Sequence, residues 1–557
     1  MNRILQVNIR MAHLMLAVLA LFAYLVIFIP FFLQIAGDAQ VHLAVAERFV
    51  EGHPFTYNAD EVVVASTSPF WTLMLVALMM MSGSAAVLFL KILCSTIYFL
   101  IALLLWHVAG RYFSVRQRFA RLLLVLWLFC VPVLANALSG LENILSAFQV
   151  LSSLVLAAGC ARSAKQSVAG GAAMGLLLGW ALLTRPDGGA LCLLVFALYF
   201  LYRMVVLRGW LDGIAGVAVC AVFAVLVLYP WYLYQYKITG RVFTDSSLAR
   251  MYAGRRASIT LIPGCLYFHP KALVTLLLFF TPLSLGVVYW VVTLCRIYLS
   301  ERTDWREHVG RHLIEYLSMA VILAGIAFYT FVVGADHFGR YFLVVFPPFF
   351  VAGIRGLDLA ELRSRSRIGE TTRTMIILLA AGYMLAGSGI DYYRRIIRIK
   401  GYGGNLVRVM HADKQREEYT DRLLTHLNCP LTNTARVAVT EVQLRHYVDE
   451  RIVVLSLDGR TSGKILEYID PETGMPRFDD YLEAVRPDFV QLGQWSQGQN
   501  WFHYLLGYEV PDNRIGQWEM MVKNMKPGDS FVWNGRCVVY VQPDWLHIDW
   551  NEKAGPK

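Results

Sequence analysis

An aspartate stands at the end of the first long apolar segment. That segment ends near residue 35, and Asp38 follows it at the boundary expected between membrane and water. A carboxylate at this depth is costly unless it faces a polar cavity, which favours a general base that takes a proton from an acceptor hydroxyl. The alternative is a structural role, in which Asp38 caps the amphipathic helix predicted for 39–49. Position alone leaves both interpretations open.

Two further acidic positions lie at predicted helix ends on the same side as Asp38. Glu142 occurs in SGLEN and precedes an apolar segment, where a carboxylate favours a helix N-terminus. In TRPDG, Pro186 ends one helix and begins the next, so Arg185 and Asp187 could form a local pair at this joint. The other interpretation is that Glu142, Arg185 and Asp187 support the wall of a polar cavity.

Basic residues gather in two segments predicted on this same side. The motif GADHFGR contains two candidate phosphate ligands, His337 and Arg340, and a candidate for cavity support, Asp336. Arg340 begins a predicted span, which favours a position facing the cavity. The loop 236–271 supplies four more candidate phosphate ligands: Lys237, Arg250, Arg255 and Arg256. Phosphate binding would justify this cluster, since arginine offers a planar fork to phosphate oxygens, whereas contact with anionic lipid headgroups is the alternative. His53, in EGHPFTYNADE, is a further candidate for cavity support.

The elements that must position these residues are membrane-spanning helices. Of the 557 residues, 57% are hydrophobic and 16% charged, and the mean hydropathy is +0.50. The apolar residues fall into runs of about 17–25, long enough to cross a hydrocarbon core of about 30 Å. About eleven spans are predicted, at 11–35, 85–109, 119–138, 143–161, 168–184, 189–207, 211–235, 272–297, 313–333, 341–355 and 374–391. The apolar segment 69–82 is short for a crossing, so it is interpreted as a helix lying on the outer membrane surface.

Arginine placement predicts the orientation in the plasma membrane. With the N-terminus in the cytoplasm, the arginine-rich loops, such as 111–121 and 355–373, also lie there, as the positive-inside rule requires. The first loop (36–84), the loop 236–271 and everything after about residue 391 then lie outside, in the periplasm or its equivalent. The net charge of +10 therefore reflects topology, and nucleic-acid binding is excluded.

The chain divides into a transmembrane domain, 1–391, and an extracytoplasmic C-terminal domain, 392–557. The second part has short β-branched runs at 436–440, 451–455, 488–492 and 537–541, with a helical stretch at 479–485. Strands that alternate with helices predict a small α/β domain. A disulfide between Cys429 and Cys537 would suit an oxidising compartment, but spacing does not decide it.

Several other classes of protein lack support in the sequence. P-loop, GxSxG and HExxH motifs are absent, as are paired cysteines with metal-ligand spacing. The paired, broken-helix repeats of a transporter are also absent.

Six motifs in order resemble the C-type glycosyltransferase (GT-C) superfamily. They are the aspartate of the first loop, EGHPFTYN, TSPFW, SGLE, TRPDG and GADHFGRYFLVVFP, followed by a C-terminal domain that opens with RVAVTEVQLRHYVDERIVVLSLDG. Together they cover nearly the whole chain. The pattern is most similar to the mycobacterial terminal cell-wall arabinofuranosyltransferases and the related pilin arabinosyltransferases.

The resemblance implies a glycosyltransferase that takes a sugar, expected to be arabinofuranose, from a polyprenyl-phosphate donor to an extracytoplasmic glycan or protein. Asp38 would be the catalytic base. Family members usually carry two adjacent aspartates, but Gly37 stands at the first position here, so no metal or other cofactor is predicted and a divalent cation stays an open question. The alternatives are a GT-C enzyme that uses another lipid-linked sugar, such as mannose or amino-arabinose, and a non-enzymatic lipid or glycan transporter.

Overall fold

The computed structural model describes most of the transmembrane region and the strands of the C-terminal domain. The described residues are 2–58, 64, 66–161, 168–241, 259–262, 266–268, 270–300, 305–332, 338–364, 369–393, 404–406, 416–418, 420–421, 424, 434–439, 445, 448–456, 467–468, 478–485, 487, 489–492, 530–533 and 537–541. Among the predicted site residues, Arg250, Arg255, Arg256, Asp336 and His337 lie outside this set, as does Cys429.

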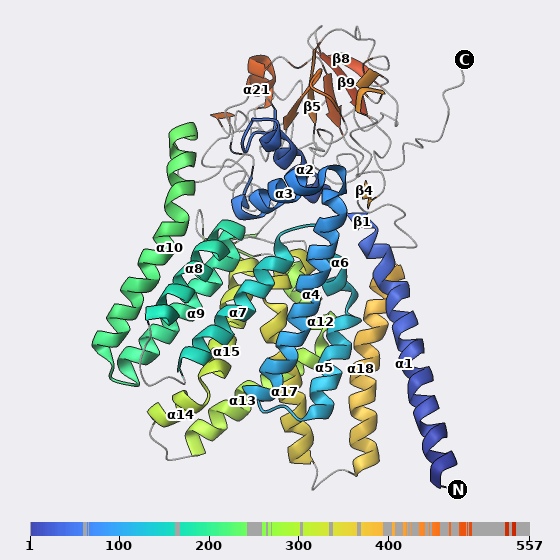
Figure 1. Cartoon of the computed structure of the whole chain (residues 1–557), viewed down its shortest axis with the longest axis vertical. Coiled ribbons are helices and arrows are strands. Elements are labelled where there is room, and N and C mark those ends of the chain that lie inside the picture. The colour runs from blue at the N-terminus through green and yellow to red at the C-terminus, as the bar shows by residue number, and fades with distance from the viewer. Residues whose placement is uncertain are drawn as a thin grey trace.

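The first part of the chain is a bundle of helices, most of them roughly parallel (Figure 1). In chain order they are α1 (Asn2–Phe32), α2 (Gly37–Val50), α3 (Pro69–Ser82), α4 (Ala86–Arg111), α5 (Gln117–Leu128), α6 (Val131–Ala137), α7 (Asn143–Ala161), α8 (Val168–Thr184), α9 (Pro186–Val205), α10 (Trp210–Thr239), α12 (Pro270–Phe279), α13 (Thr281–Ser300), α14 (Trp305–Arg311), α15 (Leu313–Ala327), α16 (Phe338–Tyr341), α17 (Phe346–Ser364) and α18 (Glu370–Tyr392). Three tighter or wider turns, η1 (Gly83–Ala85), η2 (Phe328–Val332) and η3 (Phe342–Val344), join some of them.

This part of the chain is a polytopic helical membrane protein. Within the described residues, seven helical stretches are long and apolar enough to cross a membrane, and the bent pair of α5 and α6 makes an eighth. Two shorter apolar helices, Val18–Phe32 and Val168–Thr184, match two more of the predicted spans. The predicted span 341–355 consists instead of the end of α16, η3 and the first half of α17, whose residues from Phe346 to Ile354 are all buried.

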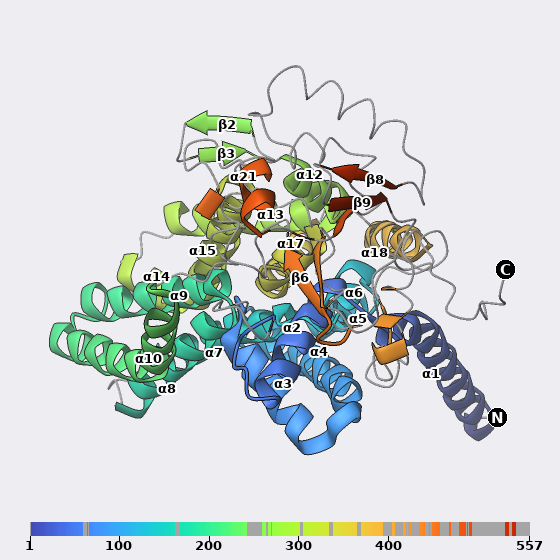
Figure 2. The same cartoon turned by 90° about the horizontal axis from the view of Figure 1, so that it is seen from above.

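Two helices lie across one end of the bundle rather than along it. Figure 1 shows α2 and α3 between the bundle and the C-terminal domain, and Figure 2 shows them side by side from above. The apolar stretch 69–111 does not continue as one straight helix, because Gly83 has a φ of +53° and ends α3. The predicted short helices 39–49 and 69–82 are therefore both present.

The helices pack closely where small residues face one another. Gly171, Gly175 and Gly179 recur every fourth residue on α8, and a Cβ added at Gly175 would come within 2.3 Å of the carbonyl oxygen of Cys220 on α10. Such stripes of small residues let two helix backbones approach closely and make van der Waals contacts. These contacts matter in a membrane because the hydrophobic effect contributes little to the association of helices that are already in lipid.

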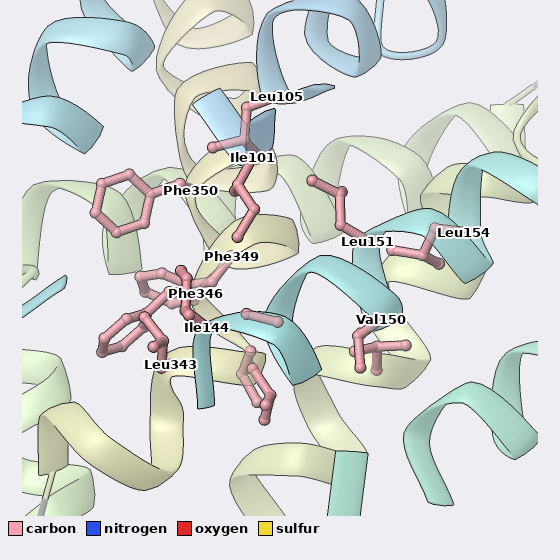
Figure 3. Close-up of a cluster of buried hydrophobic side chains, with 14 of the residues drawn as sticks. Ile101, Leu105, Ile144, Val150, Leu151, Leu154, Leu343, Phe346, Phe349 and Phe350 are labelled. Carbon is pink, nitrogen blue, oxygen red and sulfur yellow. The ribbon is translucent and has the colours of Figure 1, made fainter. Parts of the chain in front are cut away.

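A large buried cluster fills the centre of the bundle. Figure 3 shows side chains from α4 (Ile101 and Leu105), α7 (Ile144 and Val150) and η3 (Leu343) within this cluster. Further members come from α17, where Phe346, Phe349 and Phe350 are buried. This packing fixes the starts of α7 and α17 relative to each other, directly beside the loops that carry the polar residues.

The second part of the chain is an α/β domain at the α2–α3 end of the bundle (Figure 1). Its five-stranded sheet has the order β6 (Ile452–Ser456), β5 (Ala435–Val439), β7 (Phe489–Leu492), β9 (Cys537–Val541) and β8 (Ser530–Trp533), with helix α21 at Phe478–Val485. The first four strands pair in parallel and β8 is antiparallel. The four strand segments and the helix expected from sequence are confirmed, and β8 is an addition.

Contacts from α2 and the segments on either side of it join the two parts. The Asn58 side chain donates to the carbonyl of Val454 (2.8 Å) and accepts from its N–H (3.1 Å), so it takes the place of a neighbouring strand at the edge of the sheet. Arg48, buried at the end of α2, pairs with Glu51 and with Glu450 of the C-terminal domain, both at 2.7 Å. A two-residue strand pair, β1 (Gln34–Ile35) with β4 (Gly404–Asn405), adds a further link. A second small pair, β2 (Ile259–Ile262) with β3 (Leu266–Phe268), lies within the loop 236–271.

Candidate functional site

An ion pair links two segments at the α2–α3 end of the bundle. Asp38 lies in the first turn of α2 and accepts a hydrogen bond at Oδ2 from Nη1 of Arg340 in α16. The side chains are 22% and 15% exposed, so the pair lies at the edge of the buried core and within reach of a ligand. The N-cap position of helix α2 is Ala36, and Asp38 lies inside the first turn of the helix rather than at the capping position.

Arg185 is the centre of a second, largely buried ionic group. Its Nε and Nη2 bind the two carboxylate oxygens of Asp187 at 2.9 and 2.7 Å, and its Nη1 donates to Glu142 at 2.8 Å and to Oδ1 of Asn143. Asp187 also accepts from the Tyr329 hydroxyl at 2.9 Å. The expected joint at Pro186 and the local pair are thus present, and Glu142 joins them from the start of α7.

Glu142 is held in its charged form. Burial by itself raises the pKa of this carboxyl, but His42, Arg185 and Arg340 together lower it more strongly, so the pKa lies well below its usual value of 4.5. Nε2 of His42 lies 3.4 Å from Glu142 Oε2. Since His42 is four residues after Asp38, both project from one face of α2, and this spacing could have indicated His42 from the sequence.

Arg340 has donor groups left over. Its Nε and Nη2 are buried and make no hydrogen bond within the described structure. The ring of Tyr341 lies 5.7 Å from the guanidinium carbon of Arg340 and 5.7 Å from that of Arg185, so one aromatic ring contacts both cations. An unpaired guanidinium N–H in a buried setting is costly, which makes it a ready donor for an anionic ligand.

A buried lysine ties together the chain segments that precede Asp38 and Glu142. The Lys91 ammonium, on α4, donates to the carbonyls of Phe31 (3.0 Å), Gln34 (2.5 Å) and Leu138. Nothing in the sequence distinguishes Lys91 from a residue at the membrane edge. Its role follows only from the meeting of three chain segments.

The remaining predicted residues lie apart from the ionic groups. Lys237 is exposed in the last turn of α10 and forms no ion pair with any residue that the structure describes. His53 is half-buried in the turn after α2, where its carbonyl accepts from Thr56. Sequence reasoning missed His42, Tyr329, Tyr341 and Lys91.

The described side chains do not provide a divalent-cation site. Each of the three carboxylates is bound by a guanidinium, and no group of three or more His, Cys, Asp or Glu within the described segments could hold a metal. A zinc or calcium site made of protein ligands alone needs several such side chains facing one point, and the described residues do not supply one.

No protein-family model and no curated protein matches the chain. Among solved structures, it is similar to ArnT from Cupriavidus metallidurans bound to undecaprenyl phosphate, with a TM-score of 0.47 and 15% identity over 84% of this chain and 90% of ArnT. The apo form of ArnT gives the same TM-score and identity over 85% and 91%.

A third similar structure is the Archaeoglobus fulgidus oligosaccharyltransferase in complex with zinc and sulfate. It has a TM-score of 0.46 and 15% identity over 76% of this chain and 59% of the archaeal protein.

Proposed function

We propose that the chain is a membrane glycosyltransferase that moves a sugar from a polyprenyl-phosphate donor to an extracytoplasmic glycan or protein. One observation carries the proposal: the Asp38–Arg340 pair, with two unpaired guanidinium nitrogens on Arg340, at the end of a membrane bundle. A carboxylate that can accept a proton and a cation that can bind a phosphate are what transfer from a lipid phosphate needs. The ordered motifs around these two residues favour arabinofuranose as the sugar.

In the proposed reaction, an acceptor hydroxyl attacks the anomeric carbon of the donor sugar. The new C–O bond forms as the bond from that carbon to the phosphate oxygen breaks. The hydroxyl proton passes to Asp38, and the departing lipid phosphate takes the electron pair and gains one negative charge. Arg340 stabilises that charge through its free N–H groups, so no general acid is required.

Donor binding would also prepare the base. Without a ligand, Arg340 pairs with Asp38 and occupies one oxygen of the carboxylate, which leaves it less available to an acceptor hydroxyl. A donor phosphate competes for the same guanidinium and makes the carboxylate more available for the acceptor hydroxyl. The base would thus be most effective only when the donor is in place.

The buried group around Arg185 would act as a support for the reacting pair. Three carboxylates face two guanidinium groups across the whole site, which leaves one net negative charge if His42 is neutral. A phosphate therefore needs further cations, and the basic residues of the loop 236–271, including Lys237, Arg250, Arg255 and Arg256, together with His337, are the proposed source. Asp336 and His53 would complete the cavity wall. No metal enters this scheme, so activity should persist in a chelator.

The test is a transfer assay with purified full-length protein and radiolabelled polyprenyl-phosphate sugars. A glycosyltransferase releases free polyprenyl phosphate and labels the acceptor, and a panel of arabinofuranose, mannose and amino-arabinose donors identifies the sugar. Release with mannose or amino-arabinose alone would replace arabinofuranose with another sugar. Movement of intact donor across a proteoliposome membrane without release would instead identify a transporter and overturn the proposal.

A further inference from the structure

A second ionic cluster lies at the opposite end of the bundle from the C-terminal domain, where α5 and α18 begin and α17 ends (Figure 1). Two carboxylates one helical turn apart on α17, Asp358 and Glu361, form its centre, and both are buried. Four arginines surround them: Arg116, Arg118, Arg355 and Arg373. We name this group the arginine cluster.

The contacts in the arginine cluster are unequal. Arg116 binds both acids closely, and Arg118 lies 2.5 Å from Glu361. Arg355 and Arg373 are only loosely held, at 3.7 Å from Asp358 and 3.6 Å from Glu361. The acids are therefore satisfied mainly by Arg116 and Arg118, while Arg355 and Arg373 contribute charge that the cluster does not need for its own pairing.

The arginine cluster has more positive charge and more donors than its acids can use. Four guanidinium groups and two carboxylates leave a net charge of +2. Buried nitrogens on Arg116 (Nη1), Arg355 (Nε) and Arg373 (Nε and Nη1) have no hydrogen-bond partner within the described structure. Guanidinium groups that share two acids repel one another, and leaving their N–H groups unpaired adds a desolvation cost. Both costs disappear if an anion with several acceptor oxygens binds.

Backbone dipoles add to this positive potential. Helices α5 and α18 both start at the arginine cluster, with Arg116 and Gly369 at their N-termini. A helix N-terminus favours a nearby negative charge. Arg118, 46% exposed, and Arg116, 25% exposed, mark the side on which the cluster opens to the surroundings.

We propose that the arginine cluster binds the phosphate of an anionic phospholipid headgroup. The ends of membrane helices lie at headgroup level, so lipid phosphates are concentrated where the cluster is found. Arginine forks match phosphate oxygens, and the four unpaired nitrogens supply the donors. This site is separate from the Asp38–Arg340 pair and does not depend on the proposed transfer reaction.

Native mass spectrometry of the full chain, titrated with phosphatidylglycerol or phosphatidylcholine, tests the proposal. The informative variant is Arg355→Gln with Arg373→Gln, because Arg116 and Arg118 still neutralise both acids in it. Each arginine near a lipid phosphate contributes roughly fivefold to affinity, so the double variant should bind phosphatidylglycerol roughly 25-fold more weakly. Phosphatidylcholine binding should change little.

A matched control removes two charges at the same end without touching the arginine cluster. Arg111 and Arg363 are both exposed there, and Arg111→Gln with Arg363→Gln should leave phosphatidylglycerol binding within about twofold of wild type. Equal losses in both double variants would show general surface attraction and overturn the proposal. So would unchanged binding in Arg355→Gln with Arg373→Gln.

A further arm separates a lipid from a soluble ligand. If inorganic phosphate stabilises the delipidated protein and phosphatidylglycerol adds nothing, the natural ligand is a soluble phosphate and the lipid proposal is wrong. If the glutamine variant fails to fold, the double variant Arg355→Lys with Arg373→Lys is used instead, because it keeps both charges but loses the planar guanidinium groups that can each donate two hydrogen bonds to a phosphate. It should then bind phosphatidylglycerol measurably more weakly than wild type, and equal binding would refute the proposal.

Discussion

Replacing Asp38 by asparagine tests the proposed chemistry most directly. The amide keeps the size of the side chain and one oxygen that can accept from Arg340, so the arrangement of α2 and α16 should survive. What is lost is the ability to take a proton. Removal of a general base typically lowers kcat by about 10²- to 10⁴-fold. Because Asp38 does not bind the donor phosphate in this scheme, the KM for the donor should change far less than kcat.

Arg340→Gln should change both kinetic parameters: the donor KM should rise because the bound phosphate loses a partner, and kcat should fall because the charge on the departing phosphate loses its stabilisation. The variant loses charge-assisted hydrogen bonds to the phosphate worth about 1.5–3 kcal/mol, or roughly 10- to 150-fold in affinity for the donor. The combined Asp38→Asn, Arg340→Gln variant should lose less than the sum of the two free energies, because each residue alters the charge of the other.

The assay measures kcat and donor KM separately, with labelled lipid donor and a soluble acceptor in detergent. Melting temperature and gel filtration of each variant serve as controls for folding. Glu142→Gln and Asp187→Asn are the matched carboxylate variants. If Asp38→Asn keeps near-wild-type turnover while either of these abolishes it, the base lies in the buried group around Arg185 and the assignment of Asp38 is wrong.

Four other outcomes follow from the structure. Arg185→Met leaves the charges of Glu142 and Asp187 without their buried partner and should destabilise the protein by about 3–5 kcal/mol, measured as a loss of melting temperature. Lys91→Met removes the donor shared by three carbonyls and should cost about 1–3 kcal/mol in the same assay. The folded state lowers the pKa of Glu142, so the stabilisation from its charged form is fully present above the usual pKa of 4.5 and is lost only as pH falls through the lower folded value. The difference in unfolding free energy between wild type and Glu142→Gln should therefore stay constant from about pH 8 to 5 and shrink in stronger acid. A reporter fused near residue 400 should be active only as an extracytoplasmic reporter, and cytoplasmic activity would contradict the predicted topology.

Much of the architecture was readable from the sequence, because its causes are local. Membrane helices must be apolar along most of their length, so hydropathy located the segments of the long helices, such as α4, α7 and α10, and β-branched runs located strands such as β5 and β6. Hydropathy did not show the break between α12 and α13 or the short polar helix α14. The short apolar helix α3 was recognised from its length and from the arginines of 111–121, which an additional crossing would have placed outside. Strand β8 was missed because Ser530–Trp533 is short and carries no alternating pattern.

The contacts among the site residues could not be read in the same way. Asp38 and Arg340 are separated by 302 positions, and no local pattern shows that their side chains meet. In the sequence, Lys91 near the end of a span resembles an interfacial lysine, and only the structure shows the carbonyl groups around its ammonium. Arg355 and Arg373 likewise resemble ordinary positive-inside residues, and only the structure shows the two buried acids beside them. The sequence by itself determined which residues are polar and at which end of each helix they lie. Tertiary structure alone decided which charges neutralise each other and which guanidinium groups keep free donors. In a medium of low dielectric, ion pairing depends on separations of a few ångströms, and these separations are set between segments that are distant in the sequence.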